Sequence, residues 1–142
     1  MKKINAYDWQ MWRWSLKRQE ERNIQIVFVG WIRDNFPEVI TIISPIVKFG
    51  GSPTQRLIQG RTQKLMGYMK GTLDIFFPHA RNGFHGLFIE LKQEDGKTSP
   101  EQQQMINKLN NLGYVAVSAY GENEAKRIFQ EYYQGKYDTH KI

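Results

Sequence analysis

Two short segments with alternating apolar residues constrain the fold of this chain more than any other feature. They are TLDIFF, residues 72–77, and GLFIELK, residues 86–92, and the loop PHARNGFH joins them. A period of two predicts strands, and the short loop predicts that they pair as an antiparallel hairpin. One register pairs every apolar position: Leu73 with Leu91, Ile75 with Ile89, and Phe77 with Leu87. The same register places Asp74 directly opposite Glu90.

Asp74 and Glu90 would then repel each other across the hairpin. Directly opposed side chains have Cβ atoms about 5 Å apart, and like charges there destabilise a sheet. A hard divalent cation such as Mg²⁺ relieves the repulsion, because it binds carboxylate oxygens and accepts phosphate oxygens as further ligands. Lys92 shares the face of Glu90 and could stabilise the charge of an attacked phosphate. The alternative is a solvated face on which Lys92 pairs with a carboxylate, although Phe76 and Phe88 on that face favour partial burial.

The rest of the chain predicts helices that alternate with strands. Helical spacing of apolar residues predicts one long helix, or two in tandem, over residues 6–35, and Pro37 ends it. The further elements are a strand at 38–47, a helix at 54–66, a helix that begins at the N-cap Ser99, a strand at 114–120 and a helix at 122–133. The order α-β-α-β-β-α-β-α predicts an α/β fold, with a mixed sheet of about four strands flanked by helices.

Composition excludes several classes of function. The chain has 142 residues, enough for one domain, and no cysteine, which excludes disulfide scaffolds, cysteine-ligated zinc and thiol catalysis. Its net charge of +6 favours a polyanionic partner, nucleic acid before membrane, and the alternative is a merely basic soluble protein. No stretch approaches the roughly 20 apolar residues of a membrane span, and the N-terminus lacks the apolar run of a signal peptide. We therefore expect a cytoplasmic protein.

Four stretches carry a more specific pattern: ERNIQIVFVGWI, GYMKGTLDIFF, GLFIELKQEDGKTSPEQ and LGYVAVSAYGENEAKRIF. In order, they resemble the first helix, the G-x-P-D motif with its strand, the E-x-K strand with S-x-x-Q, and the closing strand and helix of VRR-NUC proteins. These virus-type replication-repair nucleases are a branch of the PD-(D/E)XK superfamily. Leu73 stands where the family has Pro, and residues 44–52 match its loop only loosely.

The resemblance covers residues 20–133 and implies a restriction-endonuclease-like fold. The whole chain, 1–142, is then expected to be a single nuclease domain. Residues 1–19 would form a helical N-terminal extension, and residues 134–142 a flexible tail.

The resemblance also assigns roles to the residues of the hairpin. Asp74 and Glu90 match the family's metal ligands, together with the backbone carbonyl of Leu91. Lys92 matches the catalytic lysine. The implied cofactor is Mg²⁺ or Mn²⁺.

Two further site residues lie outside the hairpin. Gln102 matches a helix glutamine thought to orient the lysine or a phosphate, but Ser99 and Gln102 are also spaced as a helix capping box. Glu21 matches an acid of the first helix that could hold a metal-bound water, and Gln25 lies one turn later on the same face. Glu20 replaces Glu21 if the alignment shifts by one residue. Otherwise Glu21 is an exposed helix glutamate.

The function implied by the resemblance is a metal-dependent DNA endonuclease, a hydrolase of phosphodiester bonds. Stand-alone members are similar to junction resolvases that act as homodimers, so we expect selectivity for Holliday-junction-like or other branched DNA. A small single-domain nuclease also suggests a phage or prophage origin, and so a bacterial host cytoplasm. The alternative is a nucleic-acid-binding module that keeps the nuclease fold without catalysis. A basic structural protein would instead bind regardless of divalent ions.

Basic side chains elsewhere are candidates for phosphate contacts. They are Lys48, Arg56, Arg61, Lys64 and Lys70. Each has the alternative of being a solvated surface charge. Near the N-terminus, Trp9, Trp12 and Trp14 with Arg13, Lys17 and Arg18 could stack on unpaired bases, but core or dimer packing of the tryptophans is the preferred interpretation. His79 and His85 flank the hairpin loop, and loop histidines are seldom metal ligands.

Overall fold

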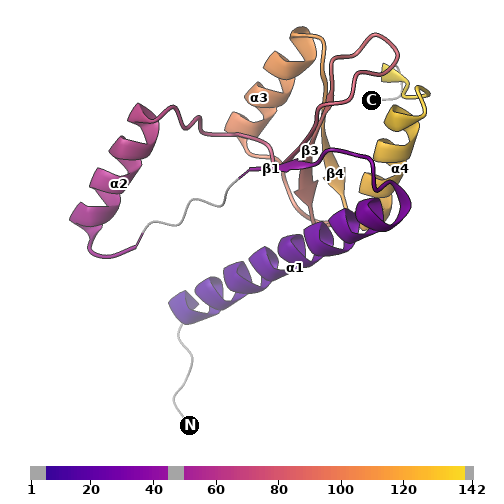
Figure 1. Cartoon of the computed structure of the whole chain (residues 1–142). Coiled ribbons are helices and arrows are strands. Elements are labelled where there is room, and N and C mark those ends of the chain that lie inside the picture. The colour runs from indigo at the N-terminus through magenta and orange to yellow at the C-terminus, as the bar shows by residue number, and fades with distance from the viewer. Residues whose placement is uncertain (1–5, 45–49, 140–142) are drawn as a thin grey trace.

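The computed structural model describes the backbone of residues 6–44 and 50–139, and within these ranges the side chains from residue 20 onward. Eight elements follow in the predicted order (Figure 1). They are α1 (Ala6–Asn35), β1 (Ile42–Ile43), α2 (Pro53–Leu65), β2 (Ile75–Phe77), β3 (Leu87–Lys92), α3 (Pro100–Asn111), β4 (Val115–Tyr120) and α4 (Glu122–Tyr133). The predicted α/β fold with a four-stranded mixed sheet is confirmed.

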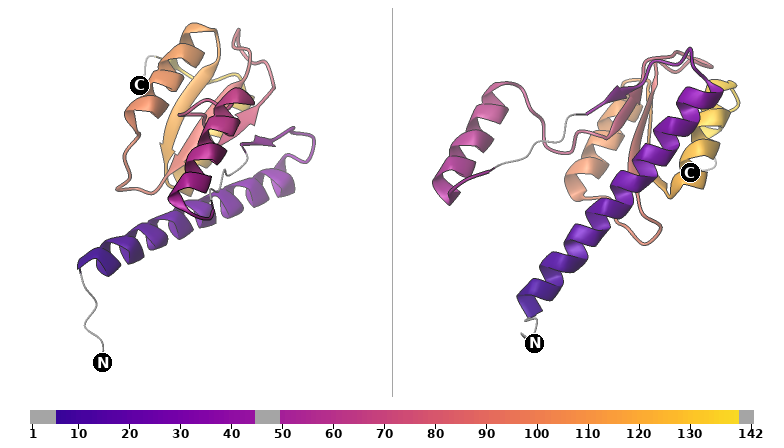
Figure 2. Two further views of the ribbon diagram at one scale, coloured as in Figure 1. Left: turned by 90° about the vertical axis from the view of Figure 1, so that its left-hand side faces the viewer. Right: turned by 60° about the horizontal axis from the view of Figure 1, so that its bottom comes forward.

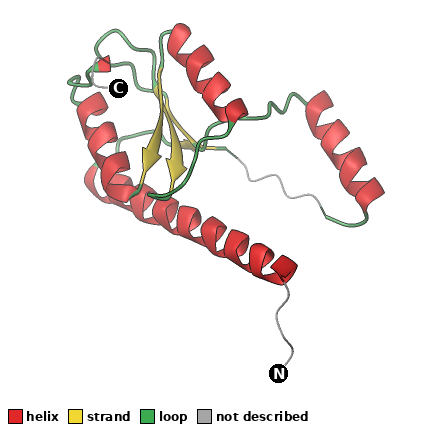
Figure 3. Cartoon of the chain, turned by 180° about the vertical axis from the view of Figure 1, so that it is seen from behind, coloured by secondary structure: helices red, strands yellow, loops and turns green. Residues whose placement is uncertain are grey.

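The sheet has the order β1-β2-β3-β4. Its strands are yellow in Figure 3, between the flanking helices. Its first two pairings are antiparallel, and β3 pairs with β4 in parallel. Ile75 lies opposite Ile89 and Phe77 opposite Leu87, which confirms the predicted hairpin register for these two pairs. The open sheet therefore sets the Asp74 end of β2 beside the Glu90 end of β3.

Helices cover both faces of this sheet. On one face, α1 and α4 enclose the main core, in which Phe28, Ile32, Ile89 and Phe129 are almost fully buried. On the other face, α3 packs on β4 through a smaller cluster around Ile106. The layers are visible in Figure 2, where the N-terminal half of α1 also extends well beyond the sheet.

Two expectations about the first strands are wrong. The segment 38–47 was expected to be one strand, but β1 has only two residues, and residues 45–47 lie outside the described range. Leu73 was expected to share a face with Ile75, but it packs in the α3 cluster. The reason is that the chain bends at Asp74, before β2 begins. Ser44 holds this bend, because its Oγ donates to the Leu73 carbonyl (2.7 Å) and its N–H to the Asp74 carbonyl (2.9 Å).

Helix α2 stands apart from the rest of the fold (Figures 1 and 2). Ser52 and Gln55 form a capping box at its start, and Pro53 occupies the first turn. None of its residues is buried. The helix is therefore held by its own caps rather than by core packing. Over the described part of the chain, no helix is both long and apolar enough to span a membrane.

Candidate active site

Asp74 and Glu90 are joined by two backbone-to-carboxylate hydrogen bonds across the end of the hairpin. The N–H of Asp74 donates to Glu90 Oε2 (3.1 Å), and the N–H of Leu91 donates to Asp74 Oδ2 (2.8 Å). The bend at Asp74 makes this exchange possible, because it turns the residue out of the regular ladder. The two carboxylates are therefore held side by side by the backbone.

Glu90 is 3% exposed, and its second carboxylate oxygen, Oε1, contacts two further side chains. Lys92 Nζ lies 3.4 Å from Glu90 Oε1, with both side chains almost fully buried. The side-chain amide of Gln102 also donates to Glu90 Oε1. One cation and one neutral donor thus converge on the same carboxylate oxygen, which fixes the position of Glu90.

Of the two alternatives for Gln102, the structure confirms the helix cap, and it adds a contact with Glu90. Its Oε1 accepts from the N–H of Ser99 (3.0 Å), while its own N–H donates to Ser99 Oγ (3.2 Å), which completes a capping box. Its Nε2 is still free to donate to Glu90. The cap of α3 and the carboxylate of β3 are therefore connected through one side chain.

The electrostatics of the pair follow from burial and like charge. Burial first, and the charge of Asp74 second, raise the pKa of Glu90 to about 7, against the lowering effect of Lys92. Burial also raises the pKa of Asp74, opposed by the Leu91 amide and by Lys92. When Asp74 and Glu90 are both ionised, Lys92 alone therefore does not balance their two negative charges.

This donor set fits a hard divalent cation. A cation between the carboxylates would favour the ionised form of both groups. Within the described residues, no group of three or more His, Cys, Asp or Glu side chains is placed to hold a metal. Asp74 and Glu90 would therefore supply two protein ligands, and the carbonyl of Leu91 is the proposed third. Such a sparse set suits Mg²⁺, which keeps several waters and takes phosphate oxygens.

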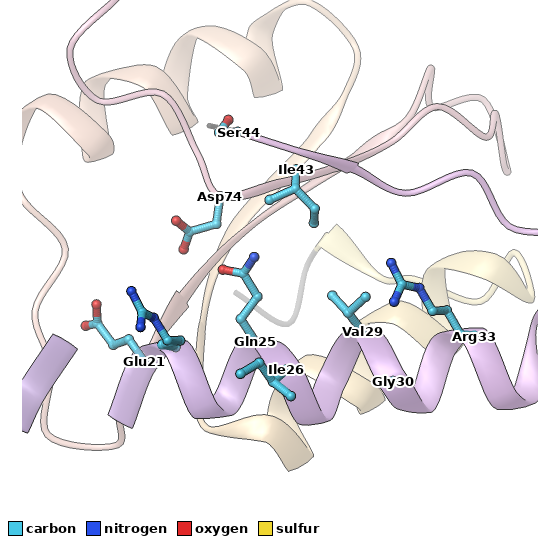
Figure 4. Close-up of a pocket in the computed structure, with 10 residues that line it drawn as sticks. Glu21, Gln25, Ile26, Val29, Gly30, Arg33, Ile43, Ser44 and Asp74 are labelled. Atoms are coloured by element: carbon cyan, nitrogen blue, oxygen red, sulfur yellow. The ribbon is translucent and has the colours of Figure 1, made fainter. Parts of the chain in front are cut away.

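A cavity of about 630 Å³ lies between α1 and β1 and reaches Asp74. Glu21 and Gln25 line it, and Figure 4 shows the Gln25 side chain turned toward Asp74, with Glu21 one turn earlier on α1. Glu20 is exposed and is not among the lining residues. The first helix thus brings the predicted Glu21, rather than its neighbour, to the cavity that Asp74 lines.

The fold is shared with a solved structure. A scan against protein-family models and a search of curated proteins both find no match. A search of solved structures finds a protein described as a VRR_NUC domain protein. It is 26% identical, with a TM-score of 0.67, over 80% of this chain and 88% of that chain. The chain has a VRR-NUC fold.

The predicted DNA-binding residues lie apart from the core of this VRR-NUC fold. Arg56, Arg61 and Lys64 are exposed on α2, where Arg56 Nε donates to the Gly51 carbonyl (3.1 Å). Lys70 forms an exposed ion pair with Glu101 of α3 (2.9 Å). Lys48 lies outside the described residues, as do the side chains of Trp9, Trp12, Trp14, Arg13, Lys17 and Arg18.

The two loop histidines make structural contacts instead of approaching the carboxylates. His79 Nε2 accepts from the N–H of Ile40 (2.8 Å), and the His85 ring packs beside Tyr114. Neither lines the cavity at Asp74.

Sequence reasoning missed several residues that shape the site. Arg22 and Arg33 line the cavity beside Asp74, although neither was among the predicted phosphate contacts. The sequence did contain a signal for them, because their helical spacing from Gln25 places both arginines near the same face of α1. Gly71 was also missed as a structural requirement: its φ is +88°, and a Cβ there would lie 2.5 Å from the carbonyl oxygen of Glu101. It lets the segment before Asp74 pass close to the start of α3.

Proposed function

We propose that this protein is a Mg²⁺- or Mn²⁺-dependent DNA endonuclease. The observation that carries the proposal is the arrangement of Asp74, Glu90, Lys92 and Gln102 in a VRR-NUC fold, next to a cavity of about 630 Å³. A nuclease-like fold and a net charge of +6 both suggest DNA as the partner. Two carboxylates that can hold a metal ion, with a lysine in contact with one of them, are suited to hydrolyse a phosphodiester bond.

Each residue has a task that its contacts support. Asp74 and Glu90 would hold the cation, with the carbonyl of Leu91. When bound, the cation would supply Lewis-acid activation and charge neutralisation at the phosphate. Lys92, whose Nζ lies beside Glu90, would stabilise developing negative charge, or hold a proton, at a phosphate bound there. Gln102 keeps the Glu90 carboxylate in one orientation.

Glu21 is proposed as a further member of the site, in a supporting role. It lines the same cavity as Asp74, from α1, and could position a water near the scissile phosphate. Gln25, one turn later, would act in the same way through its amide.

Branched DNA and a homodimer complete the proposal. Helix α2 exposes large apolar side chains, among them Leu57, Ile58 and Leu65, next to its basic residues. An exposed apolar helix is typical of an interface, and a second copy of the chain would cover it. Arg56, Arg61 and Lys64 would then contact phosphates from the same helix. Two sites related by symmetry fit the cleavage of a four-way junction in a phage-infected cytoplasm.

The test is cleavage of labelled duplex, single-stranded, flap and four-way-junction DNA, with Mg²⁺ or Mn²⁺ and with EDTA. We expect metal-dependent cutting by the wild type that Glu90→Ala and Lys92→Ala abolish. Lys108→Ala, which removes an exposed lysine of α3, is the matched control and should cut normally. Binding of every substrate without cleavage, unchanged in Glu90→Ala, would replace the nuclease with the non-catalytic binding module.

A further inference from the structure

The cavity between α1 and β1 has features that the cleavage chemistry does not need. One side of it is a face of α1 on which Arg22, Ile26, Gly30 and Arg33 recur at helical spacing. Ile43 of β1 lines the opposite side (Figure 4). The cavity therefore combines an apolar middle with an arginine toward each end, and the carboxylates of Glu21 and Asp74 also line it.

The two arginines are available to a ligand. Both are exposed, and within the described residues neither Arg22 nor Arg33 forms an ion pair or a side-chain hydrogen bond. They are eleven positions apart on one helix, which separates their Cα atoms by about 16 Å. Two guanidinium groups on one wall of a cavity, with no ion-pair partner among the described residues, are suited to phosphate groups of a chain-like anion.

Gly30 is the second independent observation. It lies inside α1, where a glycine destabilises a helix by about 0.5–1 kcal/mol relative to alanine. A Cβ built at Gly30 would meet nothing within 4 Å, so no packing contact inside the protein requires the missing side chain. What the glycine does provide is free space in the wall of the cavity. Its presence is explained if a ligand passes close to the helix backbone there.

The apolar residues decide which form of DNA fits. Ile26 is 62% exposed and Ile43 is 40% exposed, and both line the cavity with Val29. A duplex presents charged phosphates to a protein surface, whereas an unpaired strand also presents the flat apolar faces of its bases. A volume of about 630 Å³ is in the range of a small-molecule site, on the order of one or two nucleotides, and is too small for a double helix.

We infer that this cavity holds an unpaired DNA strand next to the scissile phosphate, with Arg22 and Arg33 on its phosphates and Ile26 and Ile43 against its bases. The inference rests on the proposed nuclease function, because Asp74 connects the cavity to the carboxylate pair. It specifies the substrate class as DNA with unpaired nucleotides at the cut, such as a flap or a junction whose strands separate at the branch point. A blunt duplex would lack the part that the cavity recognises.

Two variants test the cavity without touching the carboxylates. Gly30→Leu fills the free space, and its control is Asn23→Leu, which adds the same side chain to α1 at an exposed position outside the lining. Arg33→Gln removes one cation, and its control is Lys108→Gln on α3. Thermal unfolding verifies folding, and Gly30→Leu should unfold at a temperature no lower than the wild type.

Binding is measured by fluorescence anisotropy in EDTA, with a labelled oligo-dT, a 5′ flap and a blunt duplex as probes. We expect Gly30→Leu and Arg33→Gln to weaken binding of oligo-dT and of the flap by about tenfold or more. Binding of the blunt duplex should change by less than about twofold, as should all binding by the controls.

Equal losses on the duplex and the unpaired probes would overturn the inference, as would unchanged binding of oligo-dT by Gly30→Leu. The absence of metal separates this result from the nuclease proposal. A wild type that shows the expected binding pattern but never cuts with Mg²⁺ or Mn²⁺ contradicts the proposed function alone. A wild type that cuts, with Gly30→Leu binding every probe normally, contradicts the cavity inference alone.

Discussion

At the scale of single residues, Glu90 determines the character of the site. It is buried beside another carboxylate, and its three neighbours, the Asp74 amide, Lys92 and Gln102, all offer positive charge or a hydrogen-bond donor. Charge-assisted hydrogen bonds of this kind are strong and hold geometry. Even so, the pKa of Glu90 rises to about 7, so the protein alone does not fully compensate the two buried acids.

The double contact of Gln102 gives the first prediction. Gln102→Glu keeps a residue that can complete the capping box, but it replaces the amide that donates to Glu90 with a carboxylate. The new charge repels Glu90, so cleavage should fall by about tenfold or more, with helix capping intact. Ser99→Ala removes the cap instead, and should cost about 1 kcal/mol of unfolding free energy with cleavage close to normal.

Thermal unfolding and initial cleavage rates on one substrate separate the two effects. If Ser99→Ala were to abolish cleavage as fully as Gln102→Glu, Gln102 would act only by placing helix α3.

The raised pKa of Glu90 gives a pH dependence of stability in EDTA. Its ordinary value is 4.5, so between pH 4.5 and about 7 the folded protein keeps a proton that the unfolded chain has released. The unfolding free energy should therefore fall as pH rises through this window, by about 3 kcal/mol for this one group. Glu90→Gln should flatten this part of the profile in urea titrations at pH 5 and pH 8. The same slope in both proteins would assign it to other groups.

At the scale of elements, the hairpin was predictable because strand alternation and the pairing of apolar positions left one register. Asp74 beside Glu90 followed from that register, and the N-cap at Ser99 followed from local spacing. The bend at Asp74 was not predictable in this way, since the contacts that hold it come from Ser44 and from the approach of Gly71 to α3. Periodicity assumes that a strand continues, whereas tertiary contacts end it.

Gly71 supplies a prediction for this junction of elements. Gly71→Ala must place a Cβ at a φ of +88° and 2.5 Å from the Glu101 carbonyl oxygen. Gly67 is the matched control, because its φ is +97° but nothing lies within 4 Å of an added Cβ. Gly67→Ala should cost about 1–2 kcal/mol, for the backbone conformation alone. Gly71→Ala should cost about 1–3 kcal/mol more, because α3 must also move. Equal losses in urea unfolding would mean that α3 does not press on this segment.

At the scale of the whole molecule, the sequence indicated the elements, their order and the carboxylate pair, but not the cavity that gives access to them. Arg22 and Arg33 lie far from Asp74 in sequence, and only the packing of α1 against the sheet brings them together. Local sequence patterns could not predict the position of α2 either. Its helical spacing was clear, yet none of its apolar residues is buried in the chain itself.

The exposed face of α2 gives the last prediction, on oligomeric state. Leu65 is 88% exposed and Ile58 is 57% exposed, so changing them should not affect the stability of one chain. If α2 covers its counterpart in a homodimer, Leu65→Glu places two charges in a buried interface and should convert the dimer to monomer at micromolar concentration. Gln63→Glu adds the same charge to α2 at a partly exposed polar position and should leave the dimer intact.

Sedimentation velocity measures both variants against the wild type. Junction cleavage provides a second readout, because a monomer can still nick one strand but cannot make two symmetric cuts in one binding event. Dissociation of the dimer with loss of paired cuts only in Leu65→Glu would establish the interface. A wild type that sediments as a monomer at every concentration, while making paired cuts, would show that α2 does not serve self-association and that its apolar face contacts the DNA or another protein.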